Sequence, residues 1–233
     1  MTSEPALDIP LHEVALVPER TLGSPAVHEA LEGRLTFGWD VLPVKPGATR
    51  PGWHSYTEAV AGRSFCQLLM VCSFRPEQPD ARGAFVRASL GISLHTDNPT
   101  SSSPLARLIE PGERTRPVSA TGSGLRFTVK AGVVDLGVER QPSAATTREE
   151  WIVRGYGASQ ATPTWEFRRL KQYPLVGDHP VAALIELVPG HHNRAEVMLV
   201  AEVEHTTWGV RRYKARLNPA QSAIDLLMAG DRP

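Results

Sequence analysis

The sequence predicts an all-β fold: an antiparallel β-sandwich of about ten strands with two or three short peripheral helices, one of them C-terminal. Segments in which apolar and polar residues alternate recur along the chain, and 20 prolines and 19 glycines punctuate it between them. These segments do not alternate with helical patterns, which argues against a doubly wound α/β sheet. We therefore assign residues 1–233 to a single domain with an extended N-terminal segment, a length that can bury a sizeable core.

The longest run of strand pattern extends from Thr164 to Leu217. It predicts a short strand around Trp165, followed by a hairpin of Val181–Val188 and Glu196–His205 with a loop at Pro189–Arg194. A further strand, Val210–Leu217, follows the next turn. This stretch is expected to be the folding scaffold of the domain.

Two earlier segments give the clearest single-strand patterns. Phe65–Phe74 is apolar on both faces, as in a central strand, although a buried helical segment is an open alternative. Gly83–His95 alternates regularly, which places Ala88 and Leu90 on the apolar face and Phe85 on the opposite face. Further strands are expected at Val14–Val17, Arg34–Leu42, Leu125–Val138 and Glu150–Tyr156. The alternation slips at Gly132, which predicts either a β-bulge or a turn into a second strand there.

Helices and loops are expected where proline, glycine and helix-forming residues interrupt the alternation. Asn218-Pro219 resembles a helix start, and we expect a helix over Ala220–Ala229. Long loops are expected near 96–124 and 141–148. Short helical segments are expected at Pro25–Glu32, Ser55–Arg63 and Pro104–Ile109.

Charge and cysteine content limit the class of protein. Lys plus Arg equals Asp plus Glu, 25 of each, which disfavours nucleic acid as a partner and gives little self-repulsion. Cys66 and Cys72 would lie about 20 Å apart along one strand, too far for a disulfide. Buried free thiols are typical of a reducing compartment, so we expect a cytoplasmic protein. No apolar run approaches the roughly 20 residues that a membrane helix needs.

Motifs for catalysis, metals and cofactors are missing from the sequence. There is no nucleophile elbow, no phosphate-binding loop and no metal-ligand spacing. We interpret His191-His192 as solvated residues of a hairpin loop, and Glu202 with Glu204 as an outward strand face. The sequence therefore predicts no catalytic residue, no metal and no cofactor.

The most suggestive feature is a basic strand after a tryptophan-containing turn. Arg212, Lys214 and Arg216 share one face, which suits an anionic partner. The favoured alternative is that Glu202 and Glu204 pair with these bases across the hairpin. The candidate ligand-binding residues are Trp165, Arg168, Trp208, Arg212, Lys214 and Arg216.

No motif identifies a family. We predict a non-catalytic β-sandwich binding module that takes a protein partner or associates with itself. The first alternative is a small-molecule or nucleotide-binding protein that holds an anionic ligand between an aromatic pocket and the basic strand. An enzyme of unrecognised type is the second alternative. We expect neither a membrane nor a nucleic acid as partner.

Overall fold

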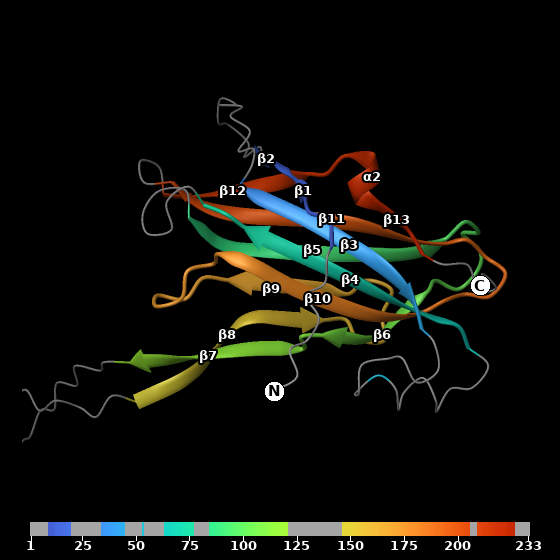
Figure 1. Cartoon of the computed structure of the whole chain (residues 1–233), viewed down its shortest axis with the longest axis horizontal. Helices are drawn as coiled ribbons and strands as arrows, with labels where there is room; N and C mark the ends of the chain where they lie inside the picture. The colour runs from blue at the N-terminus through green and yellow to red at the C-terminus, as the bar shows by residue number, and fades with distance from the viewer. Residues whose placement is uncertain are drawn as a thin grey trace, which may run out of the picture.

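A computed structural model describes residues 9–19, 34–44, 53, 63–76, 84–120, 146–205 and 209–226. Within these ranges the chain forms thirteen strands, arranged as two antiparallel sheets, and one four-residue helix (Figure 1). The prediction of an all-β protein is confirmed. The strands are more numerous, and the described helices fewer, than the sequence predicted.

The smaller sheet has five strands in the order β1-β3-β4-β10-β6. Its central strand is the apolar Phe65–Phe74 segment, as predicted, and nine of its ten residues are buried because both of its faces are covered. Its outer face packs with Ile9 and Trp53, which form a second apolar cluster. The strands are β1 (His12–Glu13), β3 (Leu35–Pro43), β4 (Phe65–Phe74), β10 (Gly177–Glu186) and β6 (Leu105–Glu110).

The larger sheet has eight strands. Seven follow the order β2-β12-β11-β5-β9-β8-β7, and the eighth, β13 (Ala223–Asp225), pairs with β11. The seven are β2 (Ala15–Pro18), β12 (Gly209–Arg216), β11 (Asn193–His205), β5 (Phe85–Thr96), β9 (Thr164–Arg168), β8 (Thr146–Tyr156) and β7 (Glu113–Ala120).

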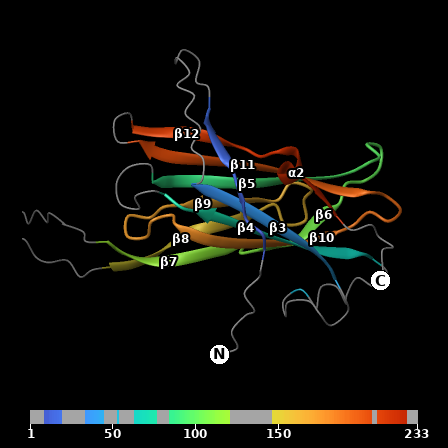
Figure 2. The ribbon, with the colours of Figure 1, turned by 45° about the horizontal axis from the view of Figure 1, so that its top comes forward.

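Side chains from both sheets contribute to one main apolar cluster. Phe74 of the smaller sheet contacts Phe85 and Phe167 of the larger one, with ring centroids 5.0 and 5.6 Å apart. Figure 2 shows the strands of the smaller sheet lying across those of the larger sheet. Burial of this cluster is the main source of stability, because each large side chain removed from water contributes about 1.5–3 kcal/mol.

Two of the passages of the chain from one sheet to the other lie at sheet edges. β1 is an edge strand of the smaller sheet and β2 is an edge strand of the larger sheet, and only the buried Val14 lies between them in the sequence. The Val14 amide donates to the Leu35 carbonyl at 2.8 Å. At the opposite edges, β6 continues into β7 through Pro111 and Gly112.

Two β-bulges shift the alternation of the larger sheet. In β5, Arg87 lies opposite Glu202 but Phe85 lies opposite Val203, so Val86 is the extra residue. The bulge turns Phe85 into the core, where it is 1% exposed. The prediction that Phe85 lies on the polar face is therefore wrong, because regular alternation does not hold across an inserted residue.

The second bulge is in β8. Val153 lies opposite Arg114 and Trp151 lies opposite Thr115, which leaves Ile152 without an opposing residue. Ile152 packs against the main core and Val153 is buried. The strand therefore continues past the bulge with its alternation reversed.

The predicted hairpin of Val181–Val188 with Glu196–His205 is wrong. β10 pairs with β4 and β6 in the smaller sheet, whereas β11 pairs with β5 and β12 in the larger one. A loop of this length suits either connection, so the sequence alone does not distinguish them.

The region predicted as a long loop near 96–124 contains two strands, β6 and β7, and β8 begins within the loop predicted near 141–148. The helical turn expected at Pro104–Ile109 is likewise a strand. β7 lacks apolar alternation because its side chains are mostly exposed, so the usual signal of a strand is missing.

The C-terminal helix is shorter than predicted. Asn218 caps α2 (Pro219–Ser222) through a capping box with Gln221, and Pro219 occupies the first turn, as expected. The chain then enters β13, because Ile224 is buried opposite Ala195 of β11. The helices expected at 25–32 and 55–63 and the strand expected at 125–138 lie outside the described residues.

Candidate functional site

The predicted basic strand is present and faces outward. Arg212, Lys214 and Arg216 are exposed on one face of β12, while Tyr213 between them is buried. The Glu19 carboxylate forms one ion pair with Arg212 at 3.2 Å and another with Lys214 at 3.1 Å. The positive charge of this strand is therefore partly neutralised by a carboxylate that follows β2.

Of the two acidic partners expected on β11, one lies in the expected position and the other does not. Glu202 lies directly opposite Arg212 on β11, as the cross-strand interpretation requires. Glu204 instead forms an ion pair with Arg169 at 2.5 Å. The outer face of the larger sheet therefore carries charges of both signs, which is typical of a solvated sheet face.

Trp165 is not brought together with the basic residues. It is fully buried on the inner face of β9, and no hydrogen-bond partner for its indole nitrogen occurs among the described residues. Arg168 is three positions further along the same strand and therefore projects from the opposite face. Trp208 lies outside the described residues. Trp165 thus belongs to the core cluster rather than to a pocket that it shares with Arg212, Lys214 and Arg216.

Arg168 makes several contacts on the outer face of the sheet. Its guanidinium carbon lies 4.0 Å from the centroid of the Trp151 ring, and that of Arg154 lies 5.1 Å from it. The Nε atom of Arg168 donates to the Trp151 carbonyl at 2.7 Å, and its terminal nitrogen pairs with Glu150 at 3.2 Å. The Trp151 ring contacts two cations because the bulge at Ile152 has turned it outward.

These contacts lie where two strands leave the rest of the sheet. β8 pairs with β9 only from Val153 to Tyr156, but β7 and β8 continue to pair as far as Ala120 and Thr146. We call this part, residues 115–120 with 146–151, the β7–β8 ribbon. It projects beyond the other strands at one end of the molecule (Figure 1).

Two side chains brace the ribbon and occupy its backbone groups. Arg168 binds the Trp151 carbonyl, which a continuing β9 strand would otherwise use. The Tyr173 hydroxyl donates to the Pro117 carbonyl at 3.1 Å, and Arg116 lies 6.0 Å from the Tyr173 ring. Because proline also lacks an N–H, neither backbone group of Pro117 is free to pair with a further strand.

A buried histidine lies near the base of the ribbon. His179 packs between Phe74 and Phe167, with ring centroids 5.4 and 5.8 Å apart. Its Nε2 atom donates to the Val176 carbonyl at 3.2 Å, and no partner for its Nδ1 atom occurs in the described chain. Burial lowers the pKa of His179, and the nearby positive charge of Arg114 lowers it further.

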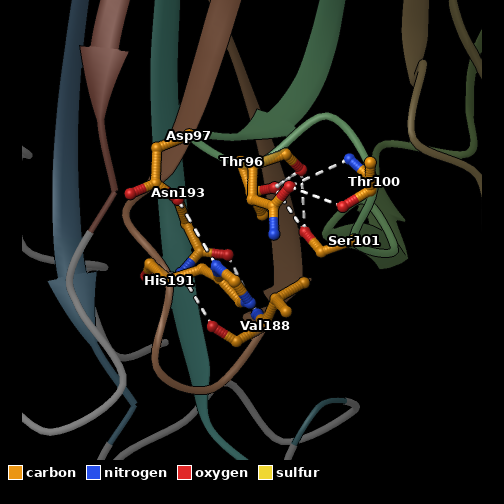
Figure 3. A network of polar contacts seen from close by, with 8 residues as sticks. Thr96, Asp97, Thr100, Ser101, Val188, His191 and Asn193 are labelled. Carbon is orange, nitrogen blue, oxygen red and sulfur yellow. Dashed lines mark hydrogen bonds and ion pairs between the residues drawn. The ribbon is translucent and has the colours of Figure 1, made fainter.

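The loop predicted at Pro189–Arg194 is held by an asparagine. The fully buried Asn193 accepts from the Val188 amide at 2.9 Å and donates to the carbonyls of Val188 and His191 (Figure 3). His191 approaches Asp97 at 3.4 Å, and His192 approaches Asp225 at 3.8 Å. Among the described residues no group of three or more His, Cys, Asp or Glu side chains is arranged to hold a metal.

Both cysteines are buried and free. Burial raises the pKa of Cys66 to about 12, and it also raises the pKa of Cys72. Neither is a reactive thiolate, which agrees with their interpretation as core residues.

Sequence reasoning missed Trp151, Arg154 and the ribbon. The run from Arg148 to Trp151 gave no apolar period, and the bulge that exposes Trp151 leaves no mark in the sequence. The only available signal was a tryptophan close to several charged residues.

No protein-family model matches this chain, and no curated protein matches it. Among solved structures, the chain is similar to the Clostridium perfringens NetB toxin in its membrane-inserted form, with a TM-score of 0.35 and 6% sequence identity. The match covers 93% of this chain and 94% of that chain. At this TM-score the similarity supports no conclusion about this protein. Within the described residues, no helix is long and apolar enough to cross a membrane.

Proposed function

We propose that this protein is a non-catalytic β binding module that associates with a second copy of itself through the β7–β8 ribbon. The observation that carries the proposal is a two-stranded ribbon that extends beyond its sheet and is braced by Arg168 and Tyr173. A two-stranded ribbon is marginally stable in water on its own, so the bracing keeps a projecting surface in one shape.

The charges of the ribbon favour association with the same surface. Arg116, Arg148, Glu149 and Glu150 give equal numbers of positive and negative groups, and the whole chain is also neutral. Two copies therefore meet without net repulsion. The outward basic strand is less suited to an anionic ligand, because Glu19 already pairs with Arg212 and Lys214.

We also propose that the two sheets form a sandwich, which is supported by the core cluster that they share. A cytoplasmic location is part of the same proposal and is supported by the two free thiols.

Sedimentation velocity over a range of protein concentrations tests the association. We expect a species heavier than the monomer that grows with concentration, and we expect Arg116→Glu with Arg148→Glu to remain monomeric. This pair of changes makes the ribbon acidic, so two copies repel each other. Arg212→Glu with Lys214→Glu is the matched control, because it changes the charge equally on β12 and should leave association intact.

A wild-type protein that is monomeric at every concentration would contradict self-association. A pull-down with the wild type and the ribbon variant as parallel baits then tests whether the ribbon binds a different protein. A protein held only by the wild type would replace the second copy as the partner, whereas no ribbon-dependent partner would end the proposal.

A further inference from the structure

His179 occupies a position between the two sheets that is suited to sensing acid. It lies on β10 of the smaller sheet, and its ring contacts Phe74 on β4 and Phe167 on β9. The Val176 carbonyl can only accept a hydrogen bond, so Nε2 carries the proton of the neutral ring and Nδ1 holds the lone pair. A second proton would therefore add at Nδ1, which is buried and has no partner within the described residues.

Phe167, which contacts His179, is linked by strand pairing to the base of the ribbon. Phe167 pairs with Val153 of β8, and Val153 pairs with Arg114 of β7. Residues directly opposite each other on antiparallel strands project from the same face, so Arg114 belongs to the inner face at the edge of the sheet. The positive charge of Arg114 lowers the pKa of His179, so it opposes a second positive charge on the histidine ring.

Burial is the largest influence on the pKa of His179 and lowers it, as does Arg114. The hydrogen bond to Val176 and the neighbouring Asp178 favour the charged form, but the net effect is a lowered pKa. Cys72 lies opposite on β4 and stays a neutral thiol, since burial raises its pKa. Phe74 and Phe167 carry no charge.

We propose that protonation of His179 loosens its packing against Phe167 and thereby releases the β7–β8 ribbon in acid. This inference rests on the proposed function, because it assigns acid control to the surface through which the protein associates. Phe167 is the connecting residue, since its ring contacts His179 and it lies opposite Val153 at the base of the ribbon.

The direction of the pH effect follows from the two states of the chain. We call the structure described above the closed state and the state with the ribbon released the opened state. In the opened or unfolded state His179 has its ordinary pKa of about 6.5, and in the closed state its pKa is lower. The opened state therefore binds more protons as the pH falls below about 6.5. The contribution of His179 to the stability of the closed state is complete above that pH and is lost as the pH falls toward the native pKa.

Hydrogen exchange of the full chain at pH 7.5 and pH 5.0, corrected for intrinsic exchange rates, tests this release. At pH 5.0 most carboxylates stay ionised, so histidine is the main group that titrates. We expect protection of 113–120 and 146–154 to fall at pH 5.0, by about tenfold for each pH unit below 6.5 until the native pKa is reached. Protection of β5 and β11 should change much less.

Three variants make the test specific. His179→Phe keeps an aromatic ring between Phe74 and Phe167 and should abolish the acid response of the ribbon. Arg114→Gln removes the positive charge that lowers the pKa of His179 and should weaken the response. This variant keeps the test usable if His179→Phe does not fold. His191→Gln removes a histidine at a distant loop and should respond like the wild type.

An acid response that is unchanged in both His179→Phe and Arg114→Gln would overturn the inference, and so would an equal loss of protection in β5 and β11. Sedimentation at the two pH values separates it from the proposed function. If hydrogen exchange in the ribbon responds to acid but the protein never associates, the acid-dependent release is supported and the self-association proposal fails.

Discussion

The bulges in β5 and β8 each insert one residue, yet they send aromatic side chains to opposite sides of the same sheet. The bulge at Val86 turns Phe85 inward, against Phe74 of the smaller sheet, with their ring centroids 5.0 Å apart. The bulge at Ile152 turns Trp151 outward, where Arg154 and Arg168 stack on its ring. The same backbone device thus builds the core in one place and the surface in the other.

The surroundings of each bulge explain the difference. β5 is a central strand with β11 on one side and β9 on the other, and its inward aromatic ring contacts Phe74 in the core cluster. The bulge in β8 lies where pairing with β9 ends, so the residues beyond it belong to a ribbon of two strands. The difference teaches that a bulge sets the direction of a side chain, while the neighbouring strands decide whether that direction leads to core or to water.

The largest expected effect is at the inward bulge. Phe85→Ala should lower the free energy of unfolding by about 3–5 kcal/mol, because it removes a buried ring and leaves a cavity. Urea denaturation measures this, with Phe85→Leu as a milder control that keeps most of the apolar volume. A loss below about 1 kcal/mol for Phe85→Ala would show that the bulge does not anchor the core.

An intermediate effect is expected at Gly155, between the outward bulge and the end of β8. A Cβ atom there would lie 2.7 Å from the Pro111 carbonyl oxygen and 3.0 Å from Ile109 Cδ1. Gly155→Ala should therefore cost about 1–3 kcal/mol in urea denaturation, since packed backbone must shift.

Gly112→Ala is the matched control for that substitution. An added Cβ at Gly112 meets no atom within 4 Å, so its free energy of unfolding should stay close to that of the wild type. Equal losses for the two alanine variants would mean that loss of glycine itself, rather than the close contact, is responsible.

The smallest effect is expected at the outward bulge. Trp151→Ala should cost about 1–2 kcal/mol, because two partly exposed cation–π contacts contribute about 0.5–1 kcal/mol each. Trp151→Phe should recover part of this loss, because it retains an aromatic face. A cost for Trp151→Ala as large as that of Phe85→Ala would contradict the contrast between the two bulges.

Much of the fold could be predicted from the sequence where one strand face is buried. The alternation in β5 and β12 and the two-sided apolar run of β4 identified those strands, because burial imposes a period of two on the residues. The prediction failed where burial is weak or local signals conflict. The mostly exposed β7 has no such period, and the helix-forming residues after Ser222 were overridden by pairing of Ile224 with β11.

The candidate site was predicted less well than the fold. The outward face of Arg212, Lys214 and Arg216 followed correctly from alternation. Their ion pairs with Glu19 did not, because β2 is distant in the sequence and its place beside β12 is set by the fold. Arg168 was selected as a ligand-binding residue, but its stacking on Trp151 depends on a bulge that composition and spacing do not reveal.

The passage of the chain between sheets at Val14 has a consequence for synthesis of the protein. Leu16 of β2 lies opposite Ala215 of β12, so the first and last long segments of the described chain are hydrogen-bonded neighbours. As the ribosome extends the chain from its N-terminus, β2 has no partner strand among the described residues until β12 has emerged. Pairing of β2 with β12 is therefore a late event, and folding to completion should be slow because this pairing joins segments that are distant in the sequence.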